Sequence, residues 1–244
     1  MLPETRSWSS RRPGLVGKVP RHLAVILDGN RRWAERHSLP LADAYQAGAD
    51  RVRELLCWCD ELRISYVTVW ALSQDNLYRE PKVVDQIVEA ITAGLRGMAA
   101  EARWPIRVVG SLDHLPHQEQ AVALRAVERD SATAPGTRLT VAVAYDGRRE
   151  IVAATQALIC AYIEGSMAGE LTEQRLADFL STAGQPDVDL LIRTSGESRL
   201  SGFMPWQTAY AEFYFTPVYW PDFDHRHFGE AIDAYADRDR RRGL

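Results

Sequence analysis

Arginine side chains and one carboxylate follow two short apolar segments that lie far apart in the sequence. A guanidinium group binds phosphate through two donors at once, and glycine lets the backbone approach a ligand closely. A carboxylate among such cations can hold Mg²⁺ bound to a diphosphate. The sequence therefore predicts a site for a polyphosphate and a metal ion. The residues concerned are Asp28, Gly29, Asn30, Arg31 and Arg32 after 23–27, and Arg193, Arg199 and Ser201 after 190–192.

A third polar cluster follows the apolar run 66–71 and contributes Ser73, Asp75, Asn76 and Arg79. Continuous apolar runs of this length are typical of strands that are buried on both faces of a parallel sheet. The carboxyl ends of parallel strands lie along one edge, where open α/β sheets bind their ligands. We therefore expect the three clusters to converge.

Each of these features also has an ordinary structural explanation. An Asp-Gly-Asn sequence is most often a turn, and an arginine after a strand is often solvated. The sequence contains neither G-x-G-x-x-G nor G-x-x-x-x-G-K-[ST], and it has no G-x-S-x-G nucleophile motif. These absences argue against a dinucleotide enzyme, a P-loop NTPase and a serine hydrolase. The six histidines show no spacing typical of a metal site.

Short apolar runs alternate with longer segments of helical periodicity between residues 22 and 240. This alternation predicts an α/β fold, a single domain with a mainly parallel central sheet flanked by helices. The predicted strands are 23–27, 66–71, 106–109, 139–144, 188–192 and 212–215. The predicted helices are one that begins near Asn30 and others at 41–62, 81–98, 117–129, 149–164, 172–180 and 226–240.

Composition excludes several classes of protein. Of the 244 residues, 46% are hydrophobic and 25% are charged, with a formal net charge of −4. Mild acidity argues against a general nucleic-acid binder, and no apolar run approaches the ~18–20 residues of a transmembrane segment. Three cysteines cannot all pair, which favours a reduced, cytoplasmic setting. Residues 1–21 are basic and lack an apolar core, so we expect a flexible N-terminal arm before a catalytic domain at 22–244.

Five blocks of the sequence, in the same order, resemble the cis-prenyltransferases, the undecaprenyl diphosphate synthase-like enzymes. The first block reads His-Leu-Ala-Val-Ile-Leu-Asp-Gly-Asn-Arg-Arg-Trp-Ala at 22–34, and the others lie at 71–76, 144–151, 189–201 and 206–223. The resemblance covers about residues 20–243. It implies a Mg²⁺-dependent transfer of a prenyl group from an allylic diphosphate to isopentenyl diphosphate, with release of diphosphate.

The resemblance also implies a role for each matching position. Asp28 and Asn76 would be the catalytic residues, Asp28 as a Mg²⁺ ligand and Asn76 as an aid to proton removal near the reacting carbons. Glu212 matches a second metal ligand. The substrate-binding residues would be Gly29, Asn30, Arg31, Arg32, Trp33 and Tyr45 around the allylic diphosphate, Ser73, Asp75 and Arg79 in support of Asn76, and Arg193, Arg199 and Ser201 around the homoallylic diphosphate.

Two further features follow from the same resemblance. The C-terminal sequence Arg241-Arg242-Gly243 is similar to an R-x-G motif that reaches into the neighbouring subunit's site. It implies a homodimer in which Arg241 and Gly243 contact substrate. A growing hydrocarbon chain needs an apolar tunnel, and the helices expected at 45–62 and 83–98 are the candidates for its walls.

Several matching positions carry residues that are unusual for the family. Arg31 replaces a glycine and Tyr45 a histidine, as in short-chain actinobacterial members that stop at ten to fifteen carbons. Leu41 replaces an arginine, Ser198 a histidine that can contact the metal, and Pro205 a leucine. The proline is similar to that of irregular, lavandulyl-type synthases. These join dimethylallyl diphosphate head-to-middle to a second allylic diphosphate such as geranyl diphosphate.

Four functions are therefore open at the level of sequence: regular short-chain synthesis, irregular coupling, a non-catalytic partner of another prenyltransferase subunit, and a phosphatase-like α/β protein. The last would need a nucleophile, a role for which Asp28 has the wrong neighbours. A non-catalytic partner is expected to lose the aspartate and arginines that bind diphosphate. This chain keeps Asp28, Arg32, Asn76, Arg193 and Arg199. Turnover of allylic diphosphate with Mg²⁺ separates an enzyme from a binding partner, and the structure of the product separates the two modes of coupling.

Overall fold

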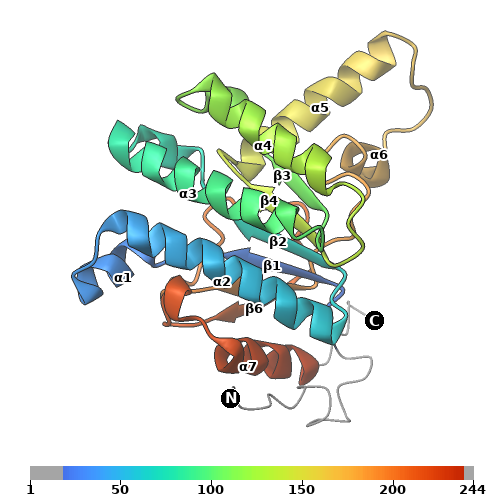
Figure 1. Ribbon diagram of the computed structural model, residues 1–244. Helices are drawn as coiled ribbons and strands as arrows, with labels where there is room; N and C mark the ends of the chain where they lie inside the picture. Colours follow the sequence, from blue (N-terminus) through green and yellow to red (C-terminus); the bar gives the residue numbers. More distant parts are fainter. Residues whose placement is uncertain (1–18, 239–244) are drawn as a thin grey trace.

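The computed structural model describes residues 19–238. All hydrogen-bonded strand pairs of its sheet run parallel, and the order of the strands is β3-β4-β2-β1-β5-β6 (Figure 1). This arrangement confirms the predicted α/β fold with a parallel central sheet. The strands are β1 (His22–Ile26), β2 (Tyr66–Trp70), β3 (Ile106–Val109), β4 (Arg138–Ala142), β5 (Leu190–Arg193) and β6 (Glu212–Phe215).

The central strand β1 is apolar at successive positions because both of its faces are covered. Leu23 and Val25 belong to one core, Ala24 and Ile26 belong to the other, and none of the four is more than 5% exposed. β2 on one side and β5 on the other pair with its backbone. The strand therefore leaves room for polar side chains only at its two ends.

Four helices supply the larger core on one face of the sheet (Figure 1). α2 and α3 approach each other closely, since a Cβ built on Gly94 would lie 2.9 Å from the Cβ of Ala49. Small residues at this crossing therefore set the distance between the two helices. The four helices are α2 (Leu41–Leu62), α3 (Pro81–Ala100), α4 (Gln118–Ser131) and α7 (His225–Ala236).

The smaller core on the opposite face is covered largely by the irregular segment between β5 and β6. This segment supplies Phe203 and Met204, which are fully buried. The ring of Pro205 packs against the start of α5 so tightly that a Cβ on Gly147 would lie 2.2 Å from the proline Cδ. The remaining helical segments are α1 (Asn30–His37), α5 (Gly147–Ile163), α6 (Glu173–Ala177), η3 (Asp75–Tyr78), η4 (Leu112–His114) and η5 (Trp220–Asp222).

The predicted strands and helices all form, with shifts of a few residues at their ends. Two helices end earlier than predicted: α6 ends at Ala177 and not at 180, and α7 ends at Ala236, whereas the predicted helix ran to 240, of which residues 239 and 240 lie outside the described residues. Thr172 caps α6 as expected, since its hydroxyl accepts a hydrogen bond from the Arg175 N–H at 3.3 Å. Residues 1–18 of the predicted arm lie outside the described residues, as do Arg241 and Gly243.

No helix within residues 19–238 combines the length and the apolar character that a membrane span requires. The three cysteines Cys57, Cys59 and Cys160 have free thiols. Burial raises the pKa of the Cys59 thiol well above its usual value, so this sulfur stays protonated and behaves as an apolar core atom.

Candidate active site

The carboxyl ends of β1, β2 and β5 open into a cleft with a volume of about 590 Å³. The three polar clusters meet there, as the topology of a parallel sheet leads one to expect. The cleft therefore brings arginine side chains, carboxylates and amide groups together around one space. The predicted residues that line it are Asp28, Gly29, Asn30, Arg31, Arg32, Tyr45, Ser73, Asp75, Asn76, Arg79, Arg193 and Ser201.

Asp28 lies between two guanidinium groups. Its Oδ2 accepts a hydrogen bond from Nη2 of Arg193 at 3.0 Å, and its Oδ1 lies 3.5 Å from Nη2 of Arg32. The side chain of Arg193 is only 6% exposed, whereas that of Asp28 is 29% exposed. The buried arginine thus fixes the orientation of a carboxylate that remains accessible to a ligand.

The first turn of α1 is open to an anion. The helix begins at Asn30 in the lining of the cleft, and no side chain caps its first turn. Free N–H groups and the positive end of the helix dipole favour a negative ligand at such a position. Gly29 precedes the helix with φ of 111°, and a Cβ there would lie 2.9 Å from Cδ1 of Tyr219. Only glycine fits this tight turn from β1 into α1.

Hydrogen bonds hold the loop that carries Asn76. The backbone N–H of Asn76 donates to Oγ of Ser73 at 3.1 Å, and Ser73 forms an isolated parallel bridge with Tyr145. The amide nitrogen of Gln74 lies 2.7 Å from Nδ1 of His114. These contacts fix Asn76 at the end of β2, beside the first turn of α1.

The turn after β5 binds the guanidinium of Arg193 from its far side. Nη1 of Arg193 donates to Oγ of Ser201 at 2.9 Å and to the carbonyl oxygen of Arg199. Ser201 adopts the left-handed conformation with φ of 52°, which turns its backbone sharply. The guanidinium of Arg199 is 63% exposed and pairs with Glu197 at 2.5 Å. Arg193 and Ser201 are therefore inside the cleft, while Arg199 lies at its rim.

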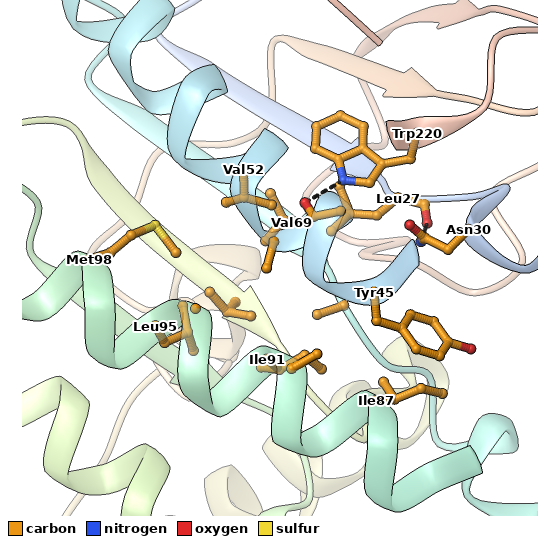
Figure 2. A pocket seen from close by; sticks show the side chains of 16 residues that line it. Leu27, Asn30, Tyr45, Val52, Val69, Ile87, Ile91, Leu95, Met98 and Trp220 are labelled. Atoms are coloured by element: carbon orange, nitrogen blue, oxygen red, sulfur yellow. Dashed lines mark hydrogen bonds between the residues drawn. The ribbon is translucent and has the colours of Figure 1, made fainter. Parts of the chain in front are cut away.

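An apolar tunnel continues from the cleft between α2 and α3, as Figure 2 shows. Its cavity has a volume of about 70 Å³, far less than that of the cleft. It runs from Tyr45 and Ile87 at its mouth to Leu95 and Met98 at its far end. The two helices that the sequence proposed as walls therefore do line a hydrocarbon-sized channel. The residues common to cleft and tunnel are Leu27, Asn30, Tyr45, Ala71 and Ile87.

Tyr45 lies at the junction of the cleft and the tunnel. Its hydroxyl and the Oδ1 of Asn30 are buried without a hydrogen-bond partner among the described residues. Burial raises the pKa of Tyr45, while the charges of Arg79 and Arg31 act in the opposite direction. The hydroxyl therefore stays protonated and can donate to a ligand oxygen at the point where the polar surface gives way to the apolar one.

Gly48 of α2 keeps this junction open. A Cβ at Gly48 would lie 2.6 Å from Oδ1 of Asn30 and 3.2 Å from Cδ1 of Trp220. The indole Nε1 of Trp220 donates to the Gly48 carbonyl oxygen at 2.8 Å, which ties η5 to α2. The absence of a side chain at position 48 is thus required by the packing around Asn30.

The family model of the undecaprenyl diphosphate synthases matches residues 26–243. The chain belongs to this family. A short-chain Z-isoprenyl diphosphate synthase of Mycobacterium leprae is 45% identical over 234 residues, which cover 93% of this chain and 88% of the relative. A (2Z,6E)-farnesyl diphosphate synthase of Thermobifida fusca is 44% identical over 233 residues, which cover 92% of this chain and 90% of the relative.

The same family is found among solved structures. A crystal structure of lavandulyl diphosphate synthase from Lavandula x intermedia in complex with dimethylallyl diphosphate matches with a TM-score of 0.88. It is 31% identical, and the match covers 93% of this chain and 99% of that chain. The backbone of the undecaprenyl diphosphate synthase family is therefore shared throughout, in agreement with the fold predicted from sequence.

Not every residue that matches the family pattern lies in the cleft. Trp33 points away from it, since its Nε1 donates to Oδ1 of Asp222 at 2.7 Å and its ring contacts His37. Arg199 lies at the rim, as described above. Arg241 and Gly243 lie outside the described residues.

Within one chain, the structure does not bring Glu212, which was expected to be a second metal ligand, to Asp28. Glu212 begins β6 in register with Leu190, whereas Arg193 pairs with Phe215 at the other end. Three residues of strand separate the two ends, or roughly 10 Å. The Glu212 carboxylate instead pairs with Arg238. The matching motif therefore identifies the glutamate but does not show at which end of β6 it lies.

Several residues that line the cleft were not predicted from the sequence. Tyr145 and Asp146 follow β4, so the rule that located the other clusters at strand ends applies to them as well. Trp70 is the last residue of β2 and was hidden inside an apolar run. The other missed residues of the lining are Ile26, Leu27, Ala71, Gln74, Ile87 and Glu197.

Membership of the family implies a divalent metal ion, and the cleft fits one. Asp28 offers a carboxylate that is partly exposed in a space wide enough for a diphosphate. Residues 19–238 contain no group of three or more His, Cys, Asp or Glu side chains placed to hold a metal by themselves. One carboxylate with the oxygens of a diphosphate is a ligand set that Mg²⁺ commonly takes in enzymes.

Proposed function

We propose that this chain is a short-chain cis-prenyltransferase that joins an allylic diphosphate to isopentenyl diphosphate, requires Mg²⁺ and releases diphosphate. The observation that carries the proposal is one continuous site, in which an arginine-flanked carboxylate leads past Tyr45 into an apolar tunnel. A prenyl diphosphate has one polar and one apolar part, and each part finds a matching surface. The names of the mycobacterial and Thermobifida relatives support the same activity.

The allylic diphosphate binds at the first turn of α1. Arg31, Arg32 and Arg79 line that part of the cleft and supply charge-assisted donors, in addition to the free N–H groups of the helix. The hydroxyl of Tyr45 donates to the same diphosphate. The hydrocarbon part enters the tunnel between α2 and α3, where burial removes its apolar surface from water.

The homoallylic diphosphate binds at the turn after β5. Arg193 and Ser201 hold it inside the cleft, and Arg199 adds a donor at the rim. Asp28 lies between this turn and α1, where it contributes the carboxylate ligand of Mg²⁺. The two diphosphates are therefore bound on either side of Asp28.

In the reaction the allylic C–O bond breaks, and its electron pair leaves with the diphosphate. The alkene of the acceptor attacks the allylic carbon, a C–C bond forms, and a neighbouring proton is lost. Arg31 and Arg32 stabilise the negative charge of the departing group, an effect that preorganised donors commonly provide. Asn76 orients the acceptor at the end of β2 and guides its proton towards the released diphosphate. Mg²⁺, when bound, supplies further stabilisation of the leaving group.

The small cavity of the tunnel supports a short product, and Arg31 and Tyr45 support the same conclusion from sequence. The proposal also includes a cytoplasmic homodimer in which the C-terminal Arg241 and Gly243 reach the neighbouring subunit's site. Analytical ultracentrifugation of the full chain tests the dimer.

Product analysis tests the proposed function. Purified full-length chain is incubated with geranyl or dimethylallyl diphosphate, radiolabelled isopentenyl diphosphate and Mg²⁺, and products are identified by mass spectrometry and NMR. We expect short linear prenyl diphosphates with a new Z double bond, and we expect EDTA to stop the reaction. If Mg²⁺ supports no consumption of allylic diphosphate, the chain is a non-catalytic partner instead.

Irregular coupling is the second candidate function, and one observation favours it. Pro205, which stands where a leucine is usual, packs directly against Gly147 beside the acceptor side of the cleft. The lavandulyl diphosphate synthase, at 31% identity, is the more distant relative. Incubation with dimethylallyl diphosphate alone separates the candidates, because only irregular coupling yields a branched product without isopentenyl diphosphate.

A further inference from the structure

Strand β2 sends neighbouring side chains to opposite sides of the site. Val69 and Ala71 line the tunnel between α2 and α3. Trp70 lines the cleft but not the tunnel, and it packs with the smaller core on the other face of the sheet. The end of β2 therefore presents an apolar side chain to the tunnel on one face of the sheet and another to the cleft on the opposite face.

The indole ring of Trp70 is held firmly from behind. It stacks on the ring of Phe203 with centroids 5.1 Å apart and planes 8° apart, and Phe203 is fully buried. The ring of Tyr145 meets Phe203 edge-on at 6.1 Å, and the Tyr145 hydroxyl donates to Oε2 of Glu150 at 2.6 Å. Trp70 is therefore a fixed, half-buried surface and not a mobile side chain on the rim of the cleft.

Trp70 lies on the same face of the sheet as Arg193. Ile26 of β1 is in register with both residues, with Arg193 on one side and Trp70 on the other. Side chains at matched positions of neighbouring parallel strands point to the same face, and strands lie about 4.8 Å apart. The α-carbons of Arg193 and Trp70 are thus roughly 10 Å apart. This spacing suits a diphosphate on the arginine and a five-carbon chain on the indole.

We propose that Trp70 is the surface on which the hydrocarbon part of the acceptor lies, and that the size of its ring restricts the acceptor to five carbons. The inference rests on the proposed function, in which Arg193 and Ser201 hold the acceptor diphosphate. The donor chain occupies the tunnel on the Val69 side of β2. The two substrates approach from opposite faces of the strand, and their reacting carbons meet beyond its end, beside Asn76.

Trp70→Ala and Trp70→Phe test the assignment with two acceptors, isopentenyl diphosphate and its homologue with ethyl in place of methyl at C3. In Trp70→Ala we expect the KM for isopentenyl diphosphate to rise about tenfold. This is the change in affinity expected when the apolar contact of about two methylene groups is lost. The preference for the larger homologue, as a ratio of kcat/KM values, should rise by a similar factor. The KM for the allylic donor should change by less than about twofold.

Ile91→Ala, on the tunnel wall of α3, is the matched control. It also removes apolar contact, but on the donor side, so its effects should fall on the allylic KM and on product length. If Trp70→Ala shifts donor KM or product length in the same way, or leaves acceptor size preference unchanged, the assignment is wrong.

Trp70→Phe protects the test against a folding defect, because it keeps a ring on Phe203 and removes an indole N–H that has no partner within the described residues. Circular dichroism checks the fold of each variant. A folded Trp70→Phe chain should show the same change in preference, reduced to about threefold, and an unchanged preference refutes the proposal. If the wild-type chain is active but the acceptor preference of both variants is unchanged, the role of Trp70 alone is refuted. If the wild-type chain is inactive with every pair of prenyl diphosphates, the proposed function is refuted as well.

Discussion

His22 and the cleft lie at opposite ends of the parallel sheet, and their buried polar atoms differ in how they are paired. At the amino end, His22 contacts the Pro186 carbonyl oxygen and Oγ1 of Thr68, both at 2.8 Å, through its two ring nitrogens. At the carboxyl end, the Oδ1 of Asn30, the hydroxyl of Tyr45 and the Nε of Arg193 are buried without a partner among the described residues. The buried His22 is thus paired within the protein, whereas these three atoms of the cleft are available to a ligand.

The carboxylates of Asp60 and Asp28 differ in the same way in their hydrogen-bond partners. Asp60, near the amino end, accepts hydrogen bonds from Nε1 of Trp104 at 2.8 Å and from both the hydroxyl and the N–H of Thr137 at 2.7 and 3.1 Å. Among residues 19–238, the carboxylate of Asp28 has only guanidinium partners, and it is partly exposed. The first carboxylate should therefore matter for stability and the second for activity.

The largest expected effect is the loss of activity in Asp28→Asn. The variant keeps a hydrogen-bond acceptor for Arg193 but loses the charge that we propose to bind Mg²⁺, so kcat should fall by about 10²–10³-fold. Urea denaturation should show a change in unfolding free energy of less than about 1 kcal/mol. Steady-state kinetics with saturating Mg²⁺ measures the rate. Retention of more than a tenth of the wild-type rate contradicts the metal role.

Asp60→Ala should have the reverse profile. It leaves the Nε1–H of Trp104 and the backbone N–H of Thr137 without an acceptor, while the Thr137 hydroxyl keeps the Ile64 carbonyl oxygen. We expect the loss to lower the unfolding free energy by about 2–4 kcal/mol. Below the unfolding transition, kcat should stay within about twofold of wild type, because Asp60 is remote from the cleft. Urea titration followed by circular dichroism provides the measurement. If the variant is stable but inactive, the division of stability and activity between the two ends of the sheet is wrong.

The amino end should also make stability depend on pH through His22. Burial lowers the pKa of this ring from its ordinary value of 6.5, although the nearby Pro186 carbonyl and Asp189 oppose the shift. Below about pH 6.5 the unfolded chain binds a proton that the folded chain does not, so the unfolding free energy falls as the pH is lowered. Urea titrations at pH 7.5 and pH 5 measure the difference. In His22→Gln the difference should shrink, and an unchanged difference would assign it to other groups.

The smallest effect is expected for Glu212→Gln. This carboxylate lies at the amino end and pairs with Arg238, a half-exposed ion pair of a kind that contributes less than about 1 kcal/mol. We expect kcat and its dependence on Mg²⁺ concentration to remain within about twofold of wild type. A large rise in the Mg²⁺ concentration needed for activity would place Glu212 in the metal site after all.

Much of the fold and the polar half of the site could be predicted from the sequence. Apolar runs such as 23–26 identify strands buried on both faces, and the polar residues that follow them must lie at the carboxyl edge of a parallel sheet. That argument located Asp28, Asn76 and Arg193 without any knowledge of their contacts. Tyr145 follows β4 and lines the same carboxyl edge, so its position in the cleft agrees with the same topological argument.

The apolar half of the site could not be predicted to the same degree. The width of the tunnel depends on how closely α2 and α3 cross at Ala49 and Gly94, a distance that no local pattern encodes. Trp70 belongs to an apolar run whose members all look alike in sequence, and only the register with Ile26 reveals its face. Likewise, the sequence motif does not show that Glu212 lies at the amino end of β6, on the side of the sheet away from the cleft's edge.

Gly48 has a cost that reaches beyond the junction it keeps open. It lies in the middle of a 22-residue helix, where alanine would be more stable by about 1 kcal/mol. A methyl group there would collide with the amide oxygen of Asn30. Any side chain that strengthens α2 at this position therefore displaces Asn30 in the proposed diphosphate site, so selection for greater thermal resistance must find its improvements elsewhere in the molecule.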